Sequence, residues 1–330
     1  MIVKKIIKVL LIGLGNISFK YDLKLSKNFI LTHNRAFSLH PNFKIVGAVD
    51  NNKKIIFGFS KKYKIPTFDN VKDALNKLNP ELIVVSTPTK THLKLIKEIF
   101  LFHKPKYIVC EKPLGNNLLE SFEIRELCEK NNSLLVVNYQ RNSSIISEKI
   151  IKFIDKNKFK PPFKITTWYS KGLNNSASHF ITLFNFLFGE ITNCNLIKSS
   201  HNRLIKDDFE LLFKLDYENC EVIFIPVDYK NFFYNSFEMI CKNGKLIYEN
   251  GGENVKWYPI DKKKVTYSNY KSLSKKFQIL ESDYYQSQFS FVNNLWRFIH
   301  GKKSMISLGS DAILTAKIIE DLKKQNNEKR

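Results

Sequence analysis

The chain has 330 residues, 43% of them hydrophobic, which is enough for two domains that each bury a core. Its formal net charge of +22 raises the question of a nucleic-acid partner, but lysine supplies nearly all of that charge. Grooves that read phosphates and base edges usually use the arginine fork, and the chain has only six arginines. We therefore expect no nucleic-acid partner, although a positive field would still attract a phosphorylated substrate or cofactor.

The cysteines and the N-terminal segment limit the compartment and the class of protein. Five cysteines, an odd number with no C-x-x-C spacing, argue against a disulfide framework and against a zinc or other metal site. Reduced thiols favour a cytoplasmic protein. The apolar run near the N-terminus leads into a glycine turn and not into a cleavage site, and no run is long enough to span a membrane.

Short apolar runs alternate with helix-like segments in the first half of the chain. The runs that predict strands are Ile6–Ile12, Phe43–Val49, Leu82–Ser86, Tyr107–Cys110 and Leu134–Asn138. The segments that predict helices are Thr32–His40, Lys53–Tyr63, Asn70–Asn79, Thr89–Phe102 and Asn117–Asn131. Such alternation predicts an α/β fold whose parallel sheet is doubly wound, with helices on both faces.

The second half has consecutive strand patterns instead. We expect strands at Phe163–Tyr169, Ile191–Lys198, Phe209–Tyr217, Glu221–Pro226, Ser236–Cys241 and Lys245–Tyr248, the last two joined by an Asn-Gly turn. Helices are expected at Ser144–Lys156, Ser178–Phe188, Tyr284–Ile299 and Ser310–Lys324, and a loop at Asp261–Lys276. The pattern predicts an α+β domain with an open, mostly antiparallel sheet. The domains predicted are residues 1–140 and 141–330, with the closing helices in the second.

A glycine-rich turn follows the first predicted strand as Gly13-x-Gly15-x-x-Ser18. In a Rossmann dinucleotide site, Gly13 would make the tight turn, Gly15 would let the backbone approach the pyrophosphate, and the amides at Asn16 and Ile17 would open the helix that receives it. Asp50 ends the next strand and would bond the adenosine ribose, which favours NAD over NADP. An ordinary strand-helix junction is the alternative.

Two features depart from that fingerprint. Ser18 stands in the third glycine position, so the helix and strand would pack slightly further apart. Asp50 lies further along than usual, which an insertion at Phe19–Ile30 would explain. Lys53 and Lys54 would tolerate a 2′-phosphate, so NADP stays open as the cofactor.

Three further motifs follow in the chain. Ser86-Thr87-Pro88 with His92 comes after a buried strand, and Glu111-Lys112 with Pro113 comes after another. Both motifs therefore lie at the carboxyl edge of the sheet, where we expect Ser86, Thr87, Pro88, His92, Glu111 and Lys112 to contact the cofactor. Taken alone, the first motif is better explained as a helix cap with a proline stop, and the second as an exposed ion pair on a turn. His179 stands on an otherwise apolar helix, where a lone histidine is more often a core residue than a catalyst.

The order and spacing of these four motifs resemble the Gfo/Idh/MocA family (glucose–fructose oxidoreductase/inositol dehydrogenase), over roughly residues 6 to 325. The resemblance implies a Rossmann domain followed by a substrate domain with an open, mostly antiparallel sheet. It also implies hydride transfer between a nicotinamide and a sugar-type hydroxyl or ketone. Relatives often form homodimers or homotetramers through the second sheet.

By the same resemblance, Lys112 matches the family lysine at the hydride-transfer site, Glu111 its acidic neighbour, and His179 the histidine that acts on the substrate. Asn175 stands where the family usually has aspartate, and an amide can position a proton but not take it. The general base is then expected to be His179 or Lys112. Arg141 is expected to meet a substrate phosphate or carboxylate, or equally to bridge the domains.

Similarity to members encoded with surface-polysaccharide genes extends to Tyr21-Asp22 and to Thr32-His33-x-x-Ala36-Phe37. The chain is thus expected to be an NAD(P)-dependent oxidoreductase of a sugar or sugar nucleotide, with a role in surface-polysaccharide biosynthesis. Asn175 and Ser18 motivate one alternative, a catalytically impaired homologue that binds dinucleotide and acts as a regulator or scaffold. A cofactor-recycling enzyme that holds NAD tightly is a second.

Overall fold

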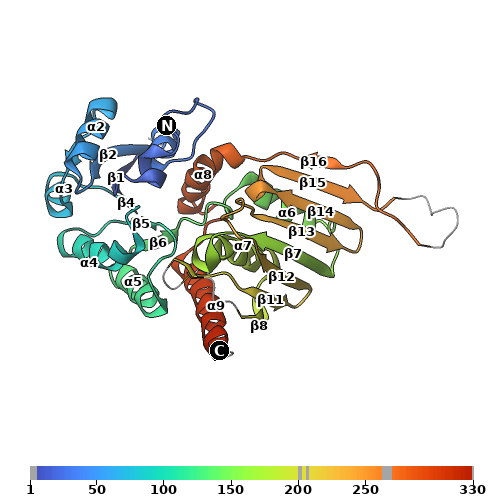
Figure 1. The fold of residues 1–330 in the computed structure, drawn as a ribbon. Helices are drawn as coiled ribbons and strands as arrows, with labels where there is room; N and C mark the ends of the chain where they lie inside the picture. Colours follow the sequence, from blue (N-terminus) through green and yellow to red (C-terminus); the bar gives the residue numbers. More distant parts are fainter. Residues whose placement is uncertain (1–5, 200–202, 206–207, 262–269, 329–330) are drawn as a thin grey trace. The chain divides into compact units, whose positions relative to one another are not determined.

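The computed structural model describes residues 6–199, 203–205, 208–261 and 270–328. The chain divides into two compact units, coloured in chain order in Figure 1. The first unit comprises the residues up to Ser143 together with Tyr285–Ala316. The second comprises Ser144–Tyr284 and the residues from Lys317 onward. Each unit has its own sheet.

The first unit contains a six-stranded parallel sheet in the order β3-β2-β1-β4-β5-β6. The strands are β1 (Ile7–Ile12), β2 (Phe43–Val49), β3 (Thr67–Phe68), β4 (Leu82–Val85), β5 (Tyr107–Cys110) and β6 (Leu134–Val137). This order reverses between β1 and β4, which is where such sheets bind ligands. The predicted doubly wound sheet is confirmed, and only the two-residue β3 was not predicted.

Both faces of this sheet are buried. Val9 and Leu11 belong to one core cluster, whereas the alternating neighbours Leu10 and Ile12 belong to the other. This alternation is why β1 is a nearly continuous apolar run. The helices that cover the sheet are α1 (His33–Leu39), α2 (Lys53–Tyr63), α3 (Val71–Lys77), α4 (His92–Phe102), α5 (Leu118–Lys130) and α8 (Ser287–Ile299).

The second unit contains an eight-stranded sheet in the order β16-β15-β14-β13-β7-β12-β11-β8. Its strands are β7 (Phe163–Tyr169), β8 (Ile191–Lys198), β11 (Leu212–Tyr217), β12 (Cys220–Pro226), β13 (Ser236–Cys241), β14 (Gly244–Glu249), β15 (Asn254–Pro259) and β16 (Gln278–Leu280). Only the β7–β12 pair among these described neighbours is parallel, so the mostly antiparallel prediction is confirmed.

Some boundaries in this unit differ from the prediction. The strand expected over residues 209–217 is interrupted, because β10 (Asp208–Phe209) pairs with β9 (Arg203–Ile205) and not with the large sheet. Strands β15 and β16 were not predicted. Half of the loop expected at Asp261–Lys276, residues 262–269, lies outside the described residues. The described residues 270–276 form no helix or strand apart from an isolated bridge of Leu273 to Ile260.

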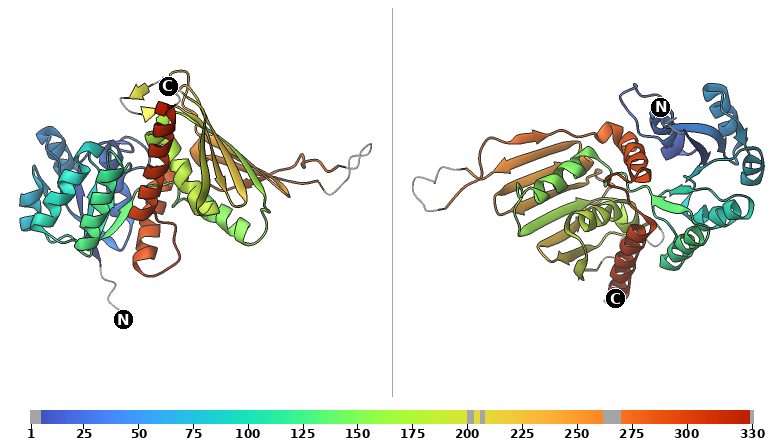
Figure 2. Two further views of the ribbon diagram at one scale, coloured as in Figure 1. Left: turned by 90° about the horizontal axis from the view of Figure 1, so that it is seen from below. Right: turned by 180° about the vertical axis from the view of Figure 1, so that it is seen from behind.

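Helices α6 (Ile145–Asp155) and α7 (Ser178–Phe188) lie against one face of this sheet, as Figures 1 and 2 show. Phe184 of α7 packs edge-on against Phe224 and Phe237 of the sheet. The opposite face carries ion pairs such as Lys214–Glu221 and Lys245–Glu238. This alternation of apolar and charged residues is typical of an antiparallel sheet with one uncovered face.

The C-terminal segment divides differently from the prediction. We expected all residues from 141 onward in the second domain, but Tyr285–Ala316 belongs to the first unit. The reason is packing: Phe291, Val292 and Leu295 of α8 are fully buried in the same core cluster as β1 and α1. The division then falls inside α9 (Gly309–Glu328).

Truncating Phe291 tests whether α8 is part of the first unit's core. We expect Phe291→Ala to lower the free energy of unfolding by about 3–5 kcal/mol, because it leaves a cavity beneath the sheet. Phe57→Ala is the matched control, because the Phe57 ring is 70% exposed, and it should change the free energy of unfolding by less than about 0.5 kcal/mol. Denaturant unfolding of both variants measures these free energies. Equal losses of stability in the two variants would contradict the placement of α8 in the core of the first unit.

Candidate dinucleotide-binding and catalytic site

In the turn after β1, residue 13 can only be glycine. Gly13 has φ +90°, and a Cβ there would lie 2.8 Å from the carbonyl oxygen of Ser86 and from Cγ2 of Thr87. The Ser86 hydroxyl lies 3.1 Å from the Ile12 carbonyl oxygen and 3.0 Å from that of Gly13, and donates to this pair. The first and second motifs are therefore joined at the ends of β1 and β4.

Gly15 differs from Gly13, because its Cβ would meet nothing within 4 Å. A side chain there would project into open space beside the turn. That space is where a pyrophosphate must approach the backbone, so the residue fits its predicted role.

Asp50 ends β2 and holds the same turn. One carboxylate oxygen accepts the Leu14 N–H at 2.7 Å, and the other accepts the Asn52 N–H at 2.9 Å. A carboxylate oxygen has further lone pairs, so Asp50 can still accept hydrogen bonds from ribose hydroxyls.

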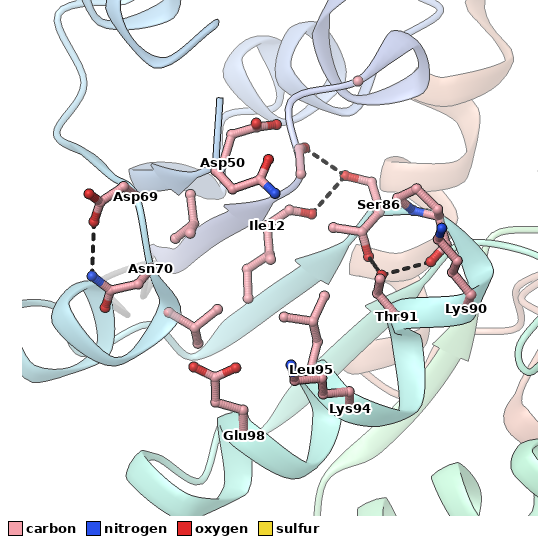
Figure 3. Close-up of a pocket in the computed structure, with 17 residues that line it drawn as sticks. Ile12, Asp50, Asp69, Asn70, Ser86, Lys90, Thr91, Lys94, Leu95 and Glu98 are labelled. Carbon is pink, nitrogen blue, oxygen red and sulfur yellow. Dashed lines mark hydrogen bonds between the residues drawn. The ribbon is translucent and has the colours of Figure 1, made fainter. Parts of the chain in front are cut away.

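A cavity of about 600 Å³ opens over the ends of β2, β1 and β4. Figure 3 shows Asp50 on one side of this cavity and Glu98 and Lys94 of α4 on the other. The residues predicted to bind cofactor that line it are Gly13, Gly15, Asp50, Ser86, Thr87 and Pro88, whereas those that do not are Asn16, Ile17, His92, Glu111 and Lys112. Asp69 and Asn70 also line the cavity, and sequence reasoning missed both. The position after β3 was their only signal, and β3 is two residues long.

The predicted pyrophosphate helix is short. Asn16–Lys20 forms a single π-helical segment of five residues, and neither Asn16 nor Ile17 lines the cavity. Ser18, in the third glycine position, is fully buried, and its hydroxyl has no hydrogen-bond partner among the described residues. The chain then runs to α1 as the predicted insertion. Asp22 ties this insertion down by accepting hydrogen bonds from the Thr32 N–H and hydroxyl.

His92 lies away from the cavity that it was expected to line. It is fully buried, with Nε2 2.9 Å from the Thr87 carbonyl oxygen and Nδ1 3.0 Å from that of Leu114. Its ring therefore joins the Ser-Thr-Pro turn to the turn that follows Glu111-Lys112-Pro113. This contact supports the site and leaves no ring nitrogen turned to the cavity.

Glu111 lies at the end of β5 in a hydrogen-bonded cluster. Its Oε1 is 2.7 Å from Nε2 of His33 and accepts a 2.7 Å bond from Nδ2 of Asn138. Burial acts to raise the pKa of Glu111, but His33, Asn138 and the nearby charge of Lys112 outweigh it and hold the pKa below its usual value. Glu111 is thus a carboxylate at neutral pH.

The other predicted residues of the first unit are partly exposed. Lys112 follows Glu111, and its peptide bond to Pro113 is cis. Arg141 lies in the turn after β6 and is also half-buried. Both belong to the first unit, with Glu111.

Asn175 and His179 lie in the second unit, on consecutive helical segments. Asn175 is in the five-residue segment Leu173–Ala177, and His179 is the second residue of α7, 8% exposed. Thr182 donates to the Ser178 carbonyl oxygen within the helix.

Asp208 is a buried carboxylate that sequence reasoning missed. It accepts the Asn174 N–H at 3.0 Å, and a Cβ on Gly172 would lie 2.5 Å from its carboxylate. Desolvation raises its pKa, although hydrogen bonds from Asn174, Leu173 and Asn175 oppose this. Asp208 therefore anchors the backbone of the segment that carries Asn175.

The described residues contain neither a candidate metal site nor a candidate membrane-spanning helix. No group of three or more His, Cys, Asp or Glu side chains there is arranged to hold a metal ion. No helix in that part of the chain is both long and apolar enough to cross a bilayer.

The geometry of the first unit agrees with comparison to known proteins. Residues 7–139 match the model of an oxidoreductase family, Gfo/Idh/MocA, described as an NAD-binding Rossmann fold. This segment of the chain is similar to the Gfo/Idh/MocA oxidoreductases. It includes the glycine turn, Asp50 and the Glu111-Lys112-Pro113 motif, and the matched domain is an NAD-binding Rossmann domain.

Among curated proteins, an uncharacterized oxidoreductase of Schizosaccharomyces pombe is 34% identical over 77 residues. The matched segment is 23% of this chain and spans only about a fifth (20%) of that relative.

Solved structures share the whole fold at low identity. The WlbA dehydrogenase of Bordetella pertussis, in complex with NADH and UDP-GlcNAcA, is 15% identical, covers 100% of this chain and 98% of its own, and has a TM-score of 0.73. A super-repressor mutant of Gal80p from Saccharomyces cerevisiae is 14% identical, with 98% of this chain and 97% of that chain aligned and a TM-score of 0.76. An oxidoreductase from Agrobacterium radiobacter, in complex with NAD⁺, L-tartaric acid and magnesium, is 15% identical, with 98% of this chain and 97% of that chain aligned and a TM-score of 0.73.

The residues present fit the adenosine half of NAD. The space over Gly15 leaves the backbone open to a pyrophosphate, and Asp50 presents a carboxylate to the cavity. Lys53 and Lys54, which would tolerate a 2′-phosphate, do not line the cavity, whose wall carries the acidic Asp69 and Glu98 and the basic Lys90 and Lys94. The carboxylate of Asp50 at the end of β2 is the feature that favours NAD over NADP.

Neutralising Asp50 tests this site. We expect Asp50→Asn to weaken NADH binding about tenfold, because a charged acceptor for the ribose hydroxyls is lost. The variant should also show a smaller difference in affinity between NADH and NADPH than the parent does. Fluorescence titration with both cofactors measures the change. Glu126→Gln, at an exposed position on α5, is the control and should bind as the parent does. An unchanged NADH affinity in Asp50→Asn would rule out the ribose contact.

Proposed function

We propose that this protein is an NAD-dependent oxidoreductase acting on a hydroxyl or keto carbon of a sugar or sugar nucleotide. The observation that carries the proposal is Glu111-Lys112-Pro113 at the end of β5. That strand lies two places from the glycine turn of an NAD-binding sheet. When bound, the nicotinamide supplies or accepts the hydride.

Lys112 is the residue proposed to handle the substrate oxygen. An ammonium group next to an ionised Glu111 can donate a hydrogen bond to a carbonyl oxygen and stabilise the negative charge that develops there. The same group can release a proton to that oxygen as a general acid. The carboxylate of Glu111 favours the charged form of Lys112.

His179 is proposed as the second catalytic group, on the substrate side. Asn175 replaces a carboxylate, so this chain has an amide that orients a substrate hydroxyl or the His179 ring without taking a proton. The proton must then pass through His179 or Lys112. We further propose that Arg141 binds a substrate phosphate or carboxylate.

A nucleotide-linked sugar is the proposed substrate class. The fold is shared over the full chain with a dehydrogenase solved with UDP-GlcNAcA, and the net charge of +22 favours an anionic substrate. A role in surface-polysaccharide biosynthesis in the cytoplasm follows from this class of substrate. All five cysteines are free thiols, which suits that compartment.

The uncovered face of the second sheet is proposed to hold two copies together as a homodimer or homotetramer. Ile223 and Ile240 are exposed on its strands between charged pairs. Light scattering on the purified protein tests this, and a monomer at micromolar concentration would contradict it.

A dinucleotide-binding regulator without turnover is the second candidate. Asn175 in place of the family carboxylate favours it, and the fold shared with a Gal80p super-repressor mutant is compatible with it. NADH binding without turnover of any UDP-sugar in a broad panel would favour this candidate over the enzyme.

Removing the Lys112 side chain separates catalysis from cofactor binding. We expect Lys112→Ala to lower kcat at least 100-fold, within the range of about 10²–10⁴ for a lost acid–base group. NADH affinity should stay within about twofold, because the cavity lining does not include Lys112. Absorbance at the NADH band with UDP-sugar substrates measures turnover.

Lys97→Ala is the control for this prediction, because Lys97 lies on α4 in an exposed pair with Glu123. It should keep the parent's turnover. Near-normal turnover by Lys112→Ala on a true substrate would remove Lys112 from the mechanism.

A further inference from the structure

Four buried or half-buried side chains form a closed ring of hydrogen bonds behind Lys112. Glu111 ends β5, Asn138 follows β6, Gln288 is on α8, and His33 begins α1. The steps are 2.7 Å from Glu111 to Asn138, 3.3 Å from Asn138 to Gln288, 2.8 Å from Gln288 to His33 and 2.7 Å from His33 back to Glu111. All four belong to the first unit.

The ring has one consistent assignment of donors and acceptors when Glu111 is ionised. A carboxylate only accepts, so Asn138 must turn its amide nitrogen to Glu111, and the same nitrogen donates to Oε1 of Gln288. Gln288 then presents its amide nitrogen to Nδ1 of His33, which must accept. His33 is therefore neutral, with its proton on Nε2, and donates to Glu111.

Reversing any one member breaks a neighbouring bond. If Gln288 turned its oxygen toward His33, its nitrogen would face the nitrogen of Asn138. If Asn138 turned as well, its oxygen would face the carboxylate of Glu111. Either arrangement places like groups together in a buried site, where an unmade hydrogen bond costs about 1–3 kcal/mol. The charge on Glu111 thus sets the proton position on His33.

Packing holds the His33 ring in place. Its side chain is fully buried, lies 6.3 Å from the Phe37 ring in a stacked arrangement, and meets the edge of Phe291 at 6.4 Å. Thr32 caps the helix by accepting the Arg35 N–H, which fixes where α1 begins. The imidazole is therefore oriented by helix, core and Gln288 before any ligand binds.

We propose that His33 is a positioning residue, which holds Glu111 ionised in one orientation and through it maintains the charge of Lys112. The inference rests on the proposed function of Lys112, although the ring itself does not. His33 touches neither the cavity lining nor a reacting atom; it acts only through Glu111. Side chains from four segments that are distant in the sequence thereby stabilise the charged groups of the Glu111-Lys112-Pro113 motif.

The proton position on His33 can be measured without any substrate. Protein labelled with ¹⁵N-histidine gives ring nitrogen signals that distinguish the two neutral tautomers and the charged ring. The His33 signals are those that disappear in His33→Gln. The donor and acceptor pattern of the ring predicts the neutral Nε2–H tautomer when Glu111 is ionised. An Nδ1–H tautomer or a doubly protonated ring at neutral pH would overturn the proposed ring.

Kinetics then test the effect on the site. In His33→Leu the donor to Glu111 is lost, so burial dominates and the pKa of Glu111 rises. Its carboxylate is then protonated at higher pH than in the parent, and the acidic limb of the kcat/KM profile moves to higher pH. We expect turnover at neutral pH to fall on the order of tenfold, as for other outer partners of reactive groups.

Two variants separate positioning from structure. His33→Gln places an amide nitrogen where Nε2 lies, so it should restore the parent's pH profile and most of its turnover. Phe37→Leu disturbs the packing of the same ring without removing a hydrogen bond to Glu111, so it should lower stability and leave the profile in place. Superimposable profiles for His33→Leu and the parent would overturn the positioning role.

The proposal and the enzyme function fail separately. If no UDP-sugar is turned over, the proposed function fails while the ¹⁵N spectra still test the ring. If Lys112→Ala loses turnover but His33→Leu keeps the parent's profile, Lys112 acts in catalysis and His33 does not position Glu111.

Discussion

The absence of a side chain at residue 13 is the constraint on which the cofactor site depends. A Cβ there would meet the Ser86 carbonyl and Thr87, so any larger residue would push the ends of β1 and β4 apart. Their close approach lets the Ser86 hydroxyl donate to the turn, and on the other side of β1 Asp50, at the end of β2, accepts the Leu14 N–H. The cavity lies where the sheet order reverses, and this turn forms its floor.

Buried polar contacts also hold the Glu111-Lys112-Pro113 motif to the same sheet. His92 connects the turn after Glu111-Lys112-Pro113 to the Thr87 turn, and so to Gly13. On the other side of β5, the hydrogen-bonded ring ties Glu111 to α1 and α8. The cofactor turn and the proposed proton donor are thus held by buried polar contacts and not by surface ion pairs, which contribute little. Helix α8 belongs to the first unit because Phe291, Val292 and Leu295 pack in its core, and Gln288 adds a polar contact to His33.

Sequence patterns predicted the elements well where a buried face has a clear period. Strands β2, β5, β7, β8 and β13 and helices α2 and α7 have the predicted bounds. The partner of an amphipathic helix is a different matter, because periodicity says that a face is buried but not against which core. That is why α8 was assigned to the other domain.

The site was predictable where one short motif carries it and not where distant segments combine. Gly13, Asp50 and Glu111 follow strands and could be found by position. The pairing of His33 with Gln288 spans 255 residues, and nothing local signals it. His92 was expected at the cofactor and instead joins two backbone turns.

The most direct test of the account is a crystal structure of the protein with NADH and a UDP-sugar substrate. The account predicts the adenosine ribose against Asp50 in the cavity, the pyrophosphate over Gly15, and Nζ of Lys112 within hydrogen-bonding distance of a substrate oxygen beside the nicotinamide C4. A dinucleotide bound elsewhere, or a nicotinamide far from Lys112, would contradict it.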